Sequence, residues 1–172
     1  MAAGDIRQQL RASSALTVTN LQGIASSTTF LSGWTSGTID NSTNLDLDLW
    51  ISAAFLVESS GLTAGQIRVY LYTEDEDNSW PDLFSAGTEG TEGTCTIHDT
   101  EVLDSGLYLI WSTVTDTSAS RVYTMPQTSV LARIGFTPRK CALYVTQSTV
   151  AALETSGNAV YVKGASANVA QS

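Results

Sequence analysis

The chain has 172 residues, a formal net charge of −9 and a sequence pI near 4.3. This acidic balance argues against nucleic acid as a partner, because a phosphate backbone requires a basic surface. No run approaches the roughly 18 apolar residues of a membrane-spanning helix, and Asp5, Arg7 and Arg11 lie where a secretory signal needs an apolar stretch. We therefore expect one domain, made in the cytoplasm, that binds neither nucleic acid nor a membrane.

Hydroxyl side chains dominate the polar residues, with 21 Ser and 23 Thr beside only 15% charged residues. This composition favours strands over helices, since Thr and aromatic residues fit a pleated surface whereas Lys and Glu fit helices. Cys95 and Cys141 lie in alternating apolar runs and form no CxxC motif, so both are expected to be buried thiols.

The first 14 residues carry Ile6 and Leu10 four positions apart among polar neighbours, which predicts a short helix or an extended arm. Further along the chain the apolar period changes to two. The longest alternating run, residues 45–57, predicts a strand with one face in a core and with Asp46 and Asp48 on the opposite, solvated face.

Other alternating runs, separated by Gly, Asn, Asp and Ser, predict further strands. They cover residues 15–22, 26–34, 66–73, 94–97, 106–114, 121–125, 129–136, 141–147 and 158–164. The Gly-rich segment 83–94 is expected to be an exposed loop between strands.

Nine or ten short strands without a long helix are typical of an all-β fold. We expect an antiparallel β-sandwich, jelly-roll-like, in which two sheets pack together. Residues 1–14 are assigned to an N-terminal arm or short helix, 15–164 to the sandwich and 165–172 to a C-terminal tail.

Catalytic motifs are absent from the sequence. The single histidine, His98, stands beside Asp99 with no G-x-S-x-G turn, and no phosphate-binding loop occurs. Asp46 and Asp48 would lie some 6 to 7 Å apart on one strand face, which suits a glycosidase pair, but a solvated edge strand produces the same pattern. We expect no enzyme and no cofactor, with a glycosidase as the enzymatic alternative.

Residues 74–82 combine four consecutive acids with Trp80, Pro81 and Asp82. Calcium takes oxygen ligands of this kind, but the EF-hand order and its glycine are missing. One His and two buried Cys do not supply a zinc site, so no metal site is predicted and calcium stays an alternative. The main expectation is that the acids make one end of the sandwich negative, while Trp80 and Pro81 fix the loop or contact a neighbour.

Four tryptophans are candidates for stacking on sugar rings, as in carbohydrate-binding β-sandwiches: Trp34, Trp50, Trp80 and Trp111. The neighbours of Trp111 indicate a core position. Trp50 and Trp80 are expected at the surface, where they would contact a glycan or a protein. With Ile6, Leu10 and Pro81, they complete the predicted set of contact residues.

Charge is distributed unevenly along the chain. Residues 69–120 hold eleven acids and no Lys or Arg, whereas residues 121–172 hold five bases and one acid, Glu154. If these segments lie on different faces, they provide an acidic and a basic surface for head-to-tail contact with copies or with a larger assembly.

Two stretches carry a resemblance to a known family. Residues 67–82, IRVYLYTEDEDNSWPD, are similar to a segment V-Y-L-Y-x-S-x-D-G-x-x-(Y/W)-P-D in small structural proteins of tailed bacteriophages and prophages. Residues 141–166, CALYVTQSTVAALETSGNAVYVKGAS, resemble the closing segment of those proteins. Together they cover about 40 of the 172 residues. The chain departs from the pattern at residues 75–79, in place of an Asp-Gly turn, and at residues 150–153, where a Gly is usual.

The resemblance implies a non-enzymatic virion protein, of the capsid decoration or cement type, bound to the major capsid protein outside the shell. Such proteins are often trimeric jelly rolls with terminal arms, so copies of the chain are expected partners and the virion is the expected location. No functional residue follows from the matched segments. The alternatives are a phage tail, neck or fibre component and a carbohydrate-binding module.

Overall fold

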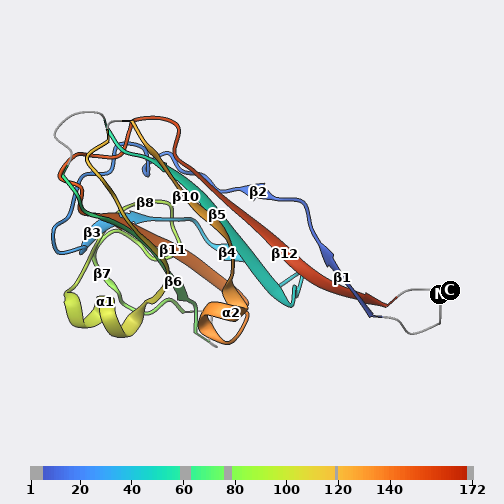
Figure 1. Ribbon diagram of the computed structural model, residues 1–172. Helices are drawn as coiled ribbons and strands as arrows, with labels where there is room; N and C mark the ends of the chain where they lie inside the picture. Colours follow the sequence, from blue (N-terminus) through green and yellow to red (C-terminus); the bar gives the residue numbers. More distant parts are fainter. Residues whose placement is uncertain (1–5, 59–62, 76–78, 119, 170–172) are drawn as a thin grey trace.

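The computed structural model describes residues 6–58, 63–75, 79–118 and 120–169 (Figure 1). They form two antiparallel sheets, named sheet A and sheet B, and two short helices. Sheet A contains β1 (Ile6–Leu10), β2 (Ser14–Ala15), β5 (Asp48–Leu56), β10 (Val122–Ser129) and β12 (Ala159–Val169). Sheet B contains β3 (Ser32–Thr35), β4 (Ile39–Asp40), β6 (Gln66–Thr73), β7 (Phe84–Ala86), β8 (Gly93–Ile97), β9 (Tyr108–Val114) and β11 (Lys140–Gln147).

Four antiparallel strand pairs are nested in the sequence: β2 pairs with β12, β3 with β11, β5 with β10, and β6 with β9. Successive pairs alternate between the sheets, and β12–β5 and β11–β6 contacts join them within each sheet. This nested order is that of a jelly roll, in which two Greek keys are wound together. The predicted fold class, an antiparallel jelly-roll-like β-sandwich, is confirmed.

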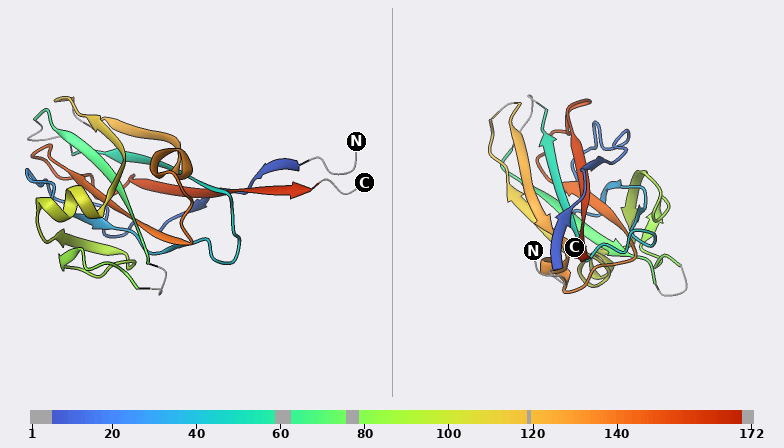
Figure 2. Two further views of the ribbon diagram at one scale, coloured as in Figure 1. Left: turned by 90° about the horizontal axis from the view of Figure 1, so that it is seen from below. Right: turned by 90° about the vertical axis from the view of Figure 1, so that its right-hand side faces the viewer.

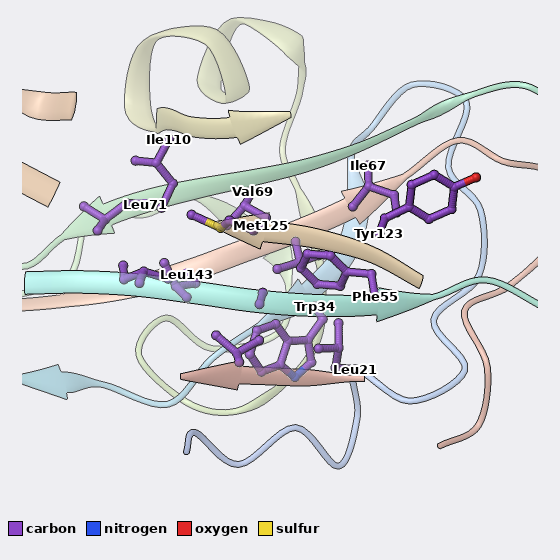
Figure 3. Close-up of a cluster of buried hydrophobic side chains, with 14 of the residues drawn as sticks. Leu21, Trp34, Phe55, Ile67, Val69, Leu71, Ile110, Tyr123, Met125 and Leu143 are labelled. Atoms are coloured by element: carbon purple, nitrogen blue, oxygen red, sulfur yellow. The ribbon is translucent and has the colours of Figure 1, made fainter. Parts of the chain in front are cut away.

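The core between the sheets follows the two-residue period of the strands. Leu49, Ile51, Ala53 and Phe55 of β5 are buried, while Trp50, Ser52 and Ala54 between them are half-buried. Figure 3 shows Trp34, Phe55 and Met125, from three different strands, gathered in this core. Burial of each such side chain contributes about 1.5–3 kcal/mol, so this cluster is the main source of stability.

Sheet B is covered on its outer face as well. Tyr70, Tyr72 and Tyr144 point away from the first core and are buried in a second cluster beneath β7, β8 and α1 (Thr100–Gly106). The ring centroid of Tyr72 lies 5.3 Å from that of Trp80 and 5.6 Å from that of Phe84. Strands β6 and β11 are therefore buried on both faces.

The expected exposed loop over residues 83–94 is partly wrong. Leu83 and Phe84 are buried in the second cluster, and β7 and β8 form a hairpin. Glu89 Oε1 accepts hydrogen bonds from the amides of Leu83 (3.0 Å) and Phe84 (2.9 Å), so a side chain replaces the missing backbone partners.

The strand expected over residues 129–136 is also wrong, because α2 (Val130–Ile134) occupies this position. Ser129 caps the helix by accepting a hydrogen bond from the Ala132 amide, and Gly135 ends it with φ +88°. The apolar residues of so short a segment fit the period of a strand and that of a helix equally well. The capping residues Ser129 and Gly135 favour the helix. No helix in the described ranges is long and apolar enough to cross a membrane.

The N-terminal residues form a strand rather than the alternative short helix. β1 pairs with β12 from Ile6 opposite Val169 to Leu10 opposite Ala165. This two-stranded ribbon projects beyond the sandwich in Figure 1 and in the left view of Figure 2, and we call it the arm. The expected tail from residue 165 is thus in strand as far as Val169.

Candidate functional site

The base of the arm is built around a buried carboxylate. Asp46 accepts a hydrogen bond from Arg11 Nε at 2.7 Å, and its side chain is only 3% exposed. The Arg11 amide donates to the Gly164 carbonyl at 2.9 Å, and the Leu47 amide to the Ala165 carbonyl at 2.7 Å. These contacts tie the end of β1, the segment before β5 and the middle of β12 together where the arm leaves the body.

The segment before β5 is held by its own side chains. Asn41 Oδ1 accepts from the Asp46 amide at 2.8 Å, and Asn41 Nδ2 donates to the Asp46 carbonyl at 3.1 Å. Gly164 lies against the Asp46 carboxylate so closely that a Cβ at this position would overlap it. The ion pair therefore depends on a glycine in the facing strand.

Three leucines are exposed beside this base: Leu10 is 51% exposed, Leu45 65% and Leu47 57%. A groove of about 380 Å³ runs between the arm and the segment before β5, and Gln9, Leu45 and Leu47 contribute to its lining. Leu45 has φ +49°, a conformation that leucine rarely adopts, and its amide is held by the Asn41 carbonyl at 2.9 Å. Exposed apolar side chains around a groove are typical of a contact surface.

The structure corrects the interpretation of Asp46 and Asp48. Both are buried, and β5 lies between β12 and β10 instead of at an edge. Asp48 accepts hydrogen bonds from Ser129 Oγ (2.6 Å) and the Leu131 amide (2.9 Å). Each carboxylate is therefore bound by structural donors, whereas a glycosidase pair must face a substrate.

The predicted aromatic contact residues lie in different layers. Trp50 is half-buried on the outer face of sheet A, and its Nε1 is buried without a hydrogen-bond partner in the described part of the chain. Trp80 packs on Tyr72 outside sheet B, and Pro81 beside it is half-buried. Trp50 and Trp80 do not form one platform for a sugar.

The other two tryptophans are structural. Trp34 is fully buried and donates from Nε1 to Glu92 Oε1 at 2.8 Å. Trp111 stacks on Phe55 with ring centroids 5.9 Å apart, as its core position predicts. Leu10 is exposed on the arm, and the side chain of Ile6 is not among those that the structure describes.

Glu92 is a structural residue that the sequence did not single out. It also accepts from the amide and the Nδ2 of Asn20, both at 2.7 Å. Burial opposes the charged form, but these three donors outweigh it and hold the pKa of Glu92 below its ordinary value. The carboxylate thus fastens the segment after β2 and Trp34 of β3 to the start of β8.

The acidic segment is tied to the rest of the body. Glu74 forms an ion pair with Lys140 at 3.2 Å, and Asp75 Oδ1 accepts from the Ser79 amide at 2.8 Å. Residues 76–78, which belong to the calcium alternative, lie outside the described residues. Within the described ranges, no three His, Cys, Asp or Glu side chains converge to hold a metal.

Acidic and basic segments of the chain are also joined directly. Lys140 reaches Glu74, and Arg121 pairs with Asp116, so two of the five bases after residue 120 neutralise acids before it. The acidic and basic segments therefore meet at these two places in the fold.

The two cysteines are buried and free, as predicted. Burial raises the pKa of Cys141 to about 12 and raises the pKa of Cys95 as well, so both stay protonated at neutral pH. His98 Nε2 lies 3.2 Å from Asp82 Oδ1 at an exposed position.

No known protein-family model matches the chain, and no curated protein matches its sequence. The phage resemblance therefore rests on residues 67–82 and 141–166. Their strands β6 and β11 pair with each other from Ile67 opposite Gln147 to Thr73 opposite Cys141. These two strands are neighbours inside sheet B, and residues 159–166 belong to β12 of sheet A, so the matched segments are part of the framework.

Proposed function

We propose that the chain is a non-enzymatic structural protein of a bacteriophage particle, of the capsid decoration type, which attaches through its arm to a shell of major capsid protein. The projecting arm is the observation that carries this proposal. A two-stranded ribbon is marginal by itself in water, so an arm that extends beyond its own body fits a protein that packs on a neighbour. The resemblance of residues 67–82 and 141–166 to phage structural proteins is what suggests a phage particle as the larger assembly.

The chemistry of the arm base supports the same role. The ion pair of Arg11 and Asp46 fixes the direction of the ribbon before any partner binds, which reduces the ordering cost of association. Leu10, Leu45 and Leu47 offer apolar surface next to that fixed ribbon. A pre-positioned arm with an apolar groove at its base suits binding to a folded surface.

The mechanism is the addition of buried interface across junctions of the shell. Interfaces of standard size bury roughly 800 Å² on each partner, and repetition over many copies multiplies the effect of each contact. Internal pressure or heat must then break the added contacts before shell subunits separate.

The test uses particles made without this protein, to which purified chain is added back. We expect the wild-type chain to co-sediment with the particles and to raise the temperature at which they open. A double variant, Leu45→Asp with Leu47→Asp, should fail in both assays because charges replace the apolar arm base. Val150→Asp, which adds a charge at another exposed side chain, is the matched control and should behave as wild type.

Two results would contradict the proposal. Particles that lack the protein but keep the same density and heat tolerance would remove the cement role. Specific binding to tails would transfer the assembly role to a tail, neck or fibre component.

A further inference from the structure

Arg68 is a half-buried arginine on the outer face of sheet B, beside the second cluster. It lies in β6 opposite Ser112 of the edge strand β9. Three contacts fix its guanidinium: Nε donates to Gln66 Oε1 at 2.9 Å, Nη1 donates to the Tyr70 hydroxyl at 3.3 Å, and Cζ lies 3.7 Å from the centroid of the Phe30 ring. The side chain is therefore held in one geometry before any partner binds.

The ring of Phe30 is held over this guanidinium by a strained backbone. Phe30 has φ +61°, in the left-handed region that a bulky residue rarely adopts. Its carbonyl accepts a hydrogen bond from the Tyr144 hydroxyl at 2.7 Å, and its amide donates to the Ser27 carbonyl at 3.1 Å. Strain of this kind persists only where the surrounding structure over-determines it, and it is concentrated at binding sites. The fold thus specifies where the guanidinium lies.

Arg68 has no counter-charge from its own chain. The segments that carry the adjacent strands β3, β6, β9 and β11 are residues 26–36, 63–73, 105–115 and 141–153, and Arg68 is the only charged residue in them. In the part of the chain that the structure describes, its guanidinium forms no ion pair, although the chain has 17 acids. The local charge at this place is therefore positive.

A pocket of about 350 Å³ opens beside the guanidinium. Its lining includes Phe30, Gly65, Gln66, Val114 and Ser148. A guanidinium has five N–H donors, and two of them are used by Gln66 and Tyr70, so three remain on Nη1 and Nη2. The Ser148 hydroxyl accepts from the Gln66 amide at 3.1 Å and has its own hydrogen to donate. The pocket therefore provides hydrogen-bond donors and a positive charge, with no acid in its lining.

We propose that this pocket binds the carboxylate of an Asp or Glu side chain that a partner protein presents. The planar fork of arginine matches the two oxygens of a carboxylate, and a fork that is already oriented loses little freedom on binding. Phe30 and Val114 supply apolar surface for the methylene groups of such a side chain. A sugar acid would instead need polar partners around its ring or an aromatic face, and the guanidinium already occupies a face of Phe30. The pocket lies on sheet B, away from the arm on sheet A, so it goes beyond the proposed function.

Nuclear magnetic resonance titration of the purified full chain tests this site. The probe is acetyl-glutamate amide, and the control ligand is acetyl-glutamine amide, which has the same shape without the charge. We expect the amide resonances of Gln66, Arg68 and Val114 to shift and saturate with the glutamate probe. The glutamine probe should bind about tenfold more weakly or less, because hydrogen bonds to a charged group are stronger. No saturable shift, or equal binding of the two probes, would overturn the proposal.

Variants separate the pocket from other positive charges. Arg68→Met should abolish the saturable shift, and Arg68→Lys should bind more weakly than wild type because an ammonium lacks the planar fork. Arg133→Met removes the same charge from an exposed position in α2 and is the matched control, which should bind as wild type. Undiminished binding by Arg68→Lys would contradict the site even if Arg68→Met does not fold.

Other anions decide the class of ligand. Glucuronate and inorganic phosphate, titrated under the same conditions, should bind more weakly than the glutamate probe. Tighter binding of either would overturn the assignment to a protein carboxylate. Since the arm has no part in this site, none of these results changes the test of attachment to a shell.

Discussion

At the scale of single residues, carboxylates that accept hydrogen bonds from distant donors organise this protein; Asp46 and Asp48 are buried and Glu92 is half-buried. Asp46 accepts a hydrogen bond from a guanidinium, Asp48 from a hydroxyl and a backbone amide, and Glu92 from an indole and from both nitrogens of Asn20. Hydrogen bonds of this kind offset the cost of removing a carboxylate from water, whereas a buried carboxylate without a donor is strongly destabilising. The sequence could not reveal these partners, because the donors to Asp48 and Glu92 come from positions 58 to 83 residues away.

The clamp around Glu92 gives a pH-dependent prediction. Because the pKa of folded Glu92 lies below the ordinary value of 4.5, the stability it contributes is complete above that value and is lost as the pH falls toward the folded pKa. Glu92→Gln should therefore lower the free energy of unfolding by about 1–2 kcal/mol at neutral pH, since hydrogen bonds to a charged group weaken. Urea unfolding at several pH values measures this.

The control for that prediction is how the difference in free energy of unfolding between wild type and Glu92→Gln changes with pH. The gap between wild type and Glu92→Gln should shrink steadily below about pH 4.5. A gap that stays constant down to acid pH would show that the charge of Glu92 is not what stabilises the clamp.

At the scale of elements, the period of the apolar residues predicted the strands that span the core. It did not predict elements whose conformation is set by pairing with a distant strand. Strands β6 and β11 follow their alternating runs almost to the residue. In β1, the spacing of Ile6 and Leu10 fits a helix as well as a strand, and pairing with β12, more than 150 positions away, selects the strand.

The contact residues were predicted less well than the strands. Alternation assigned Leu45 and Leu47 to the core, but the strand begins only at Asp48 and both leucines are exposed. The polar run Asn41 to Asn44, directly before the two leucines, is typical of a turn and indicates that the strand begins later. Trp80, which the sequence places at the surface, is half-buried, and one side of its ring packs on Tyr72 in the second cluster.

The arm base provides a test at the element scale. Gly164→Ala places a methyl group against the Asp46 carboxylate and should lower the free energy of unfolding by about 1–3 kcal/mol, the usual cost of overpacking. It should also loosen the arm, which limited proteolysis within β1 detects. Gly37→Ala is the matched control, since nothing lies within 4 Å of its added Cβ. Equal stability of the two variants would contradict the role assigned to Gly164.

At the scale of the whole molecule, the jelly roll holds the arm in a fixed position. The arm extends from sheet A along the direction of β12 (Figures 1 and 2). Sheet B is closed on its outer face by α1 and the β7–β8 hairpin, so that layer is already packed. The arm is therefore the element that we assign to attachment.

Electron cryo-microscopy of particles that carry this protein tests the central claim most directly. We expect density for the ribbon of β1 and β12 to lie on subunits of the shell, with Leu10, Leu45 and Leu47 in the contact. Particles in which the arm points into solvent while another part of the body contacts the shell would contradict the account.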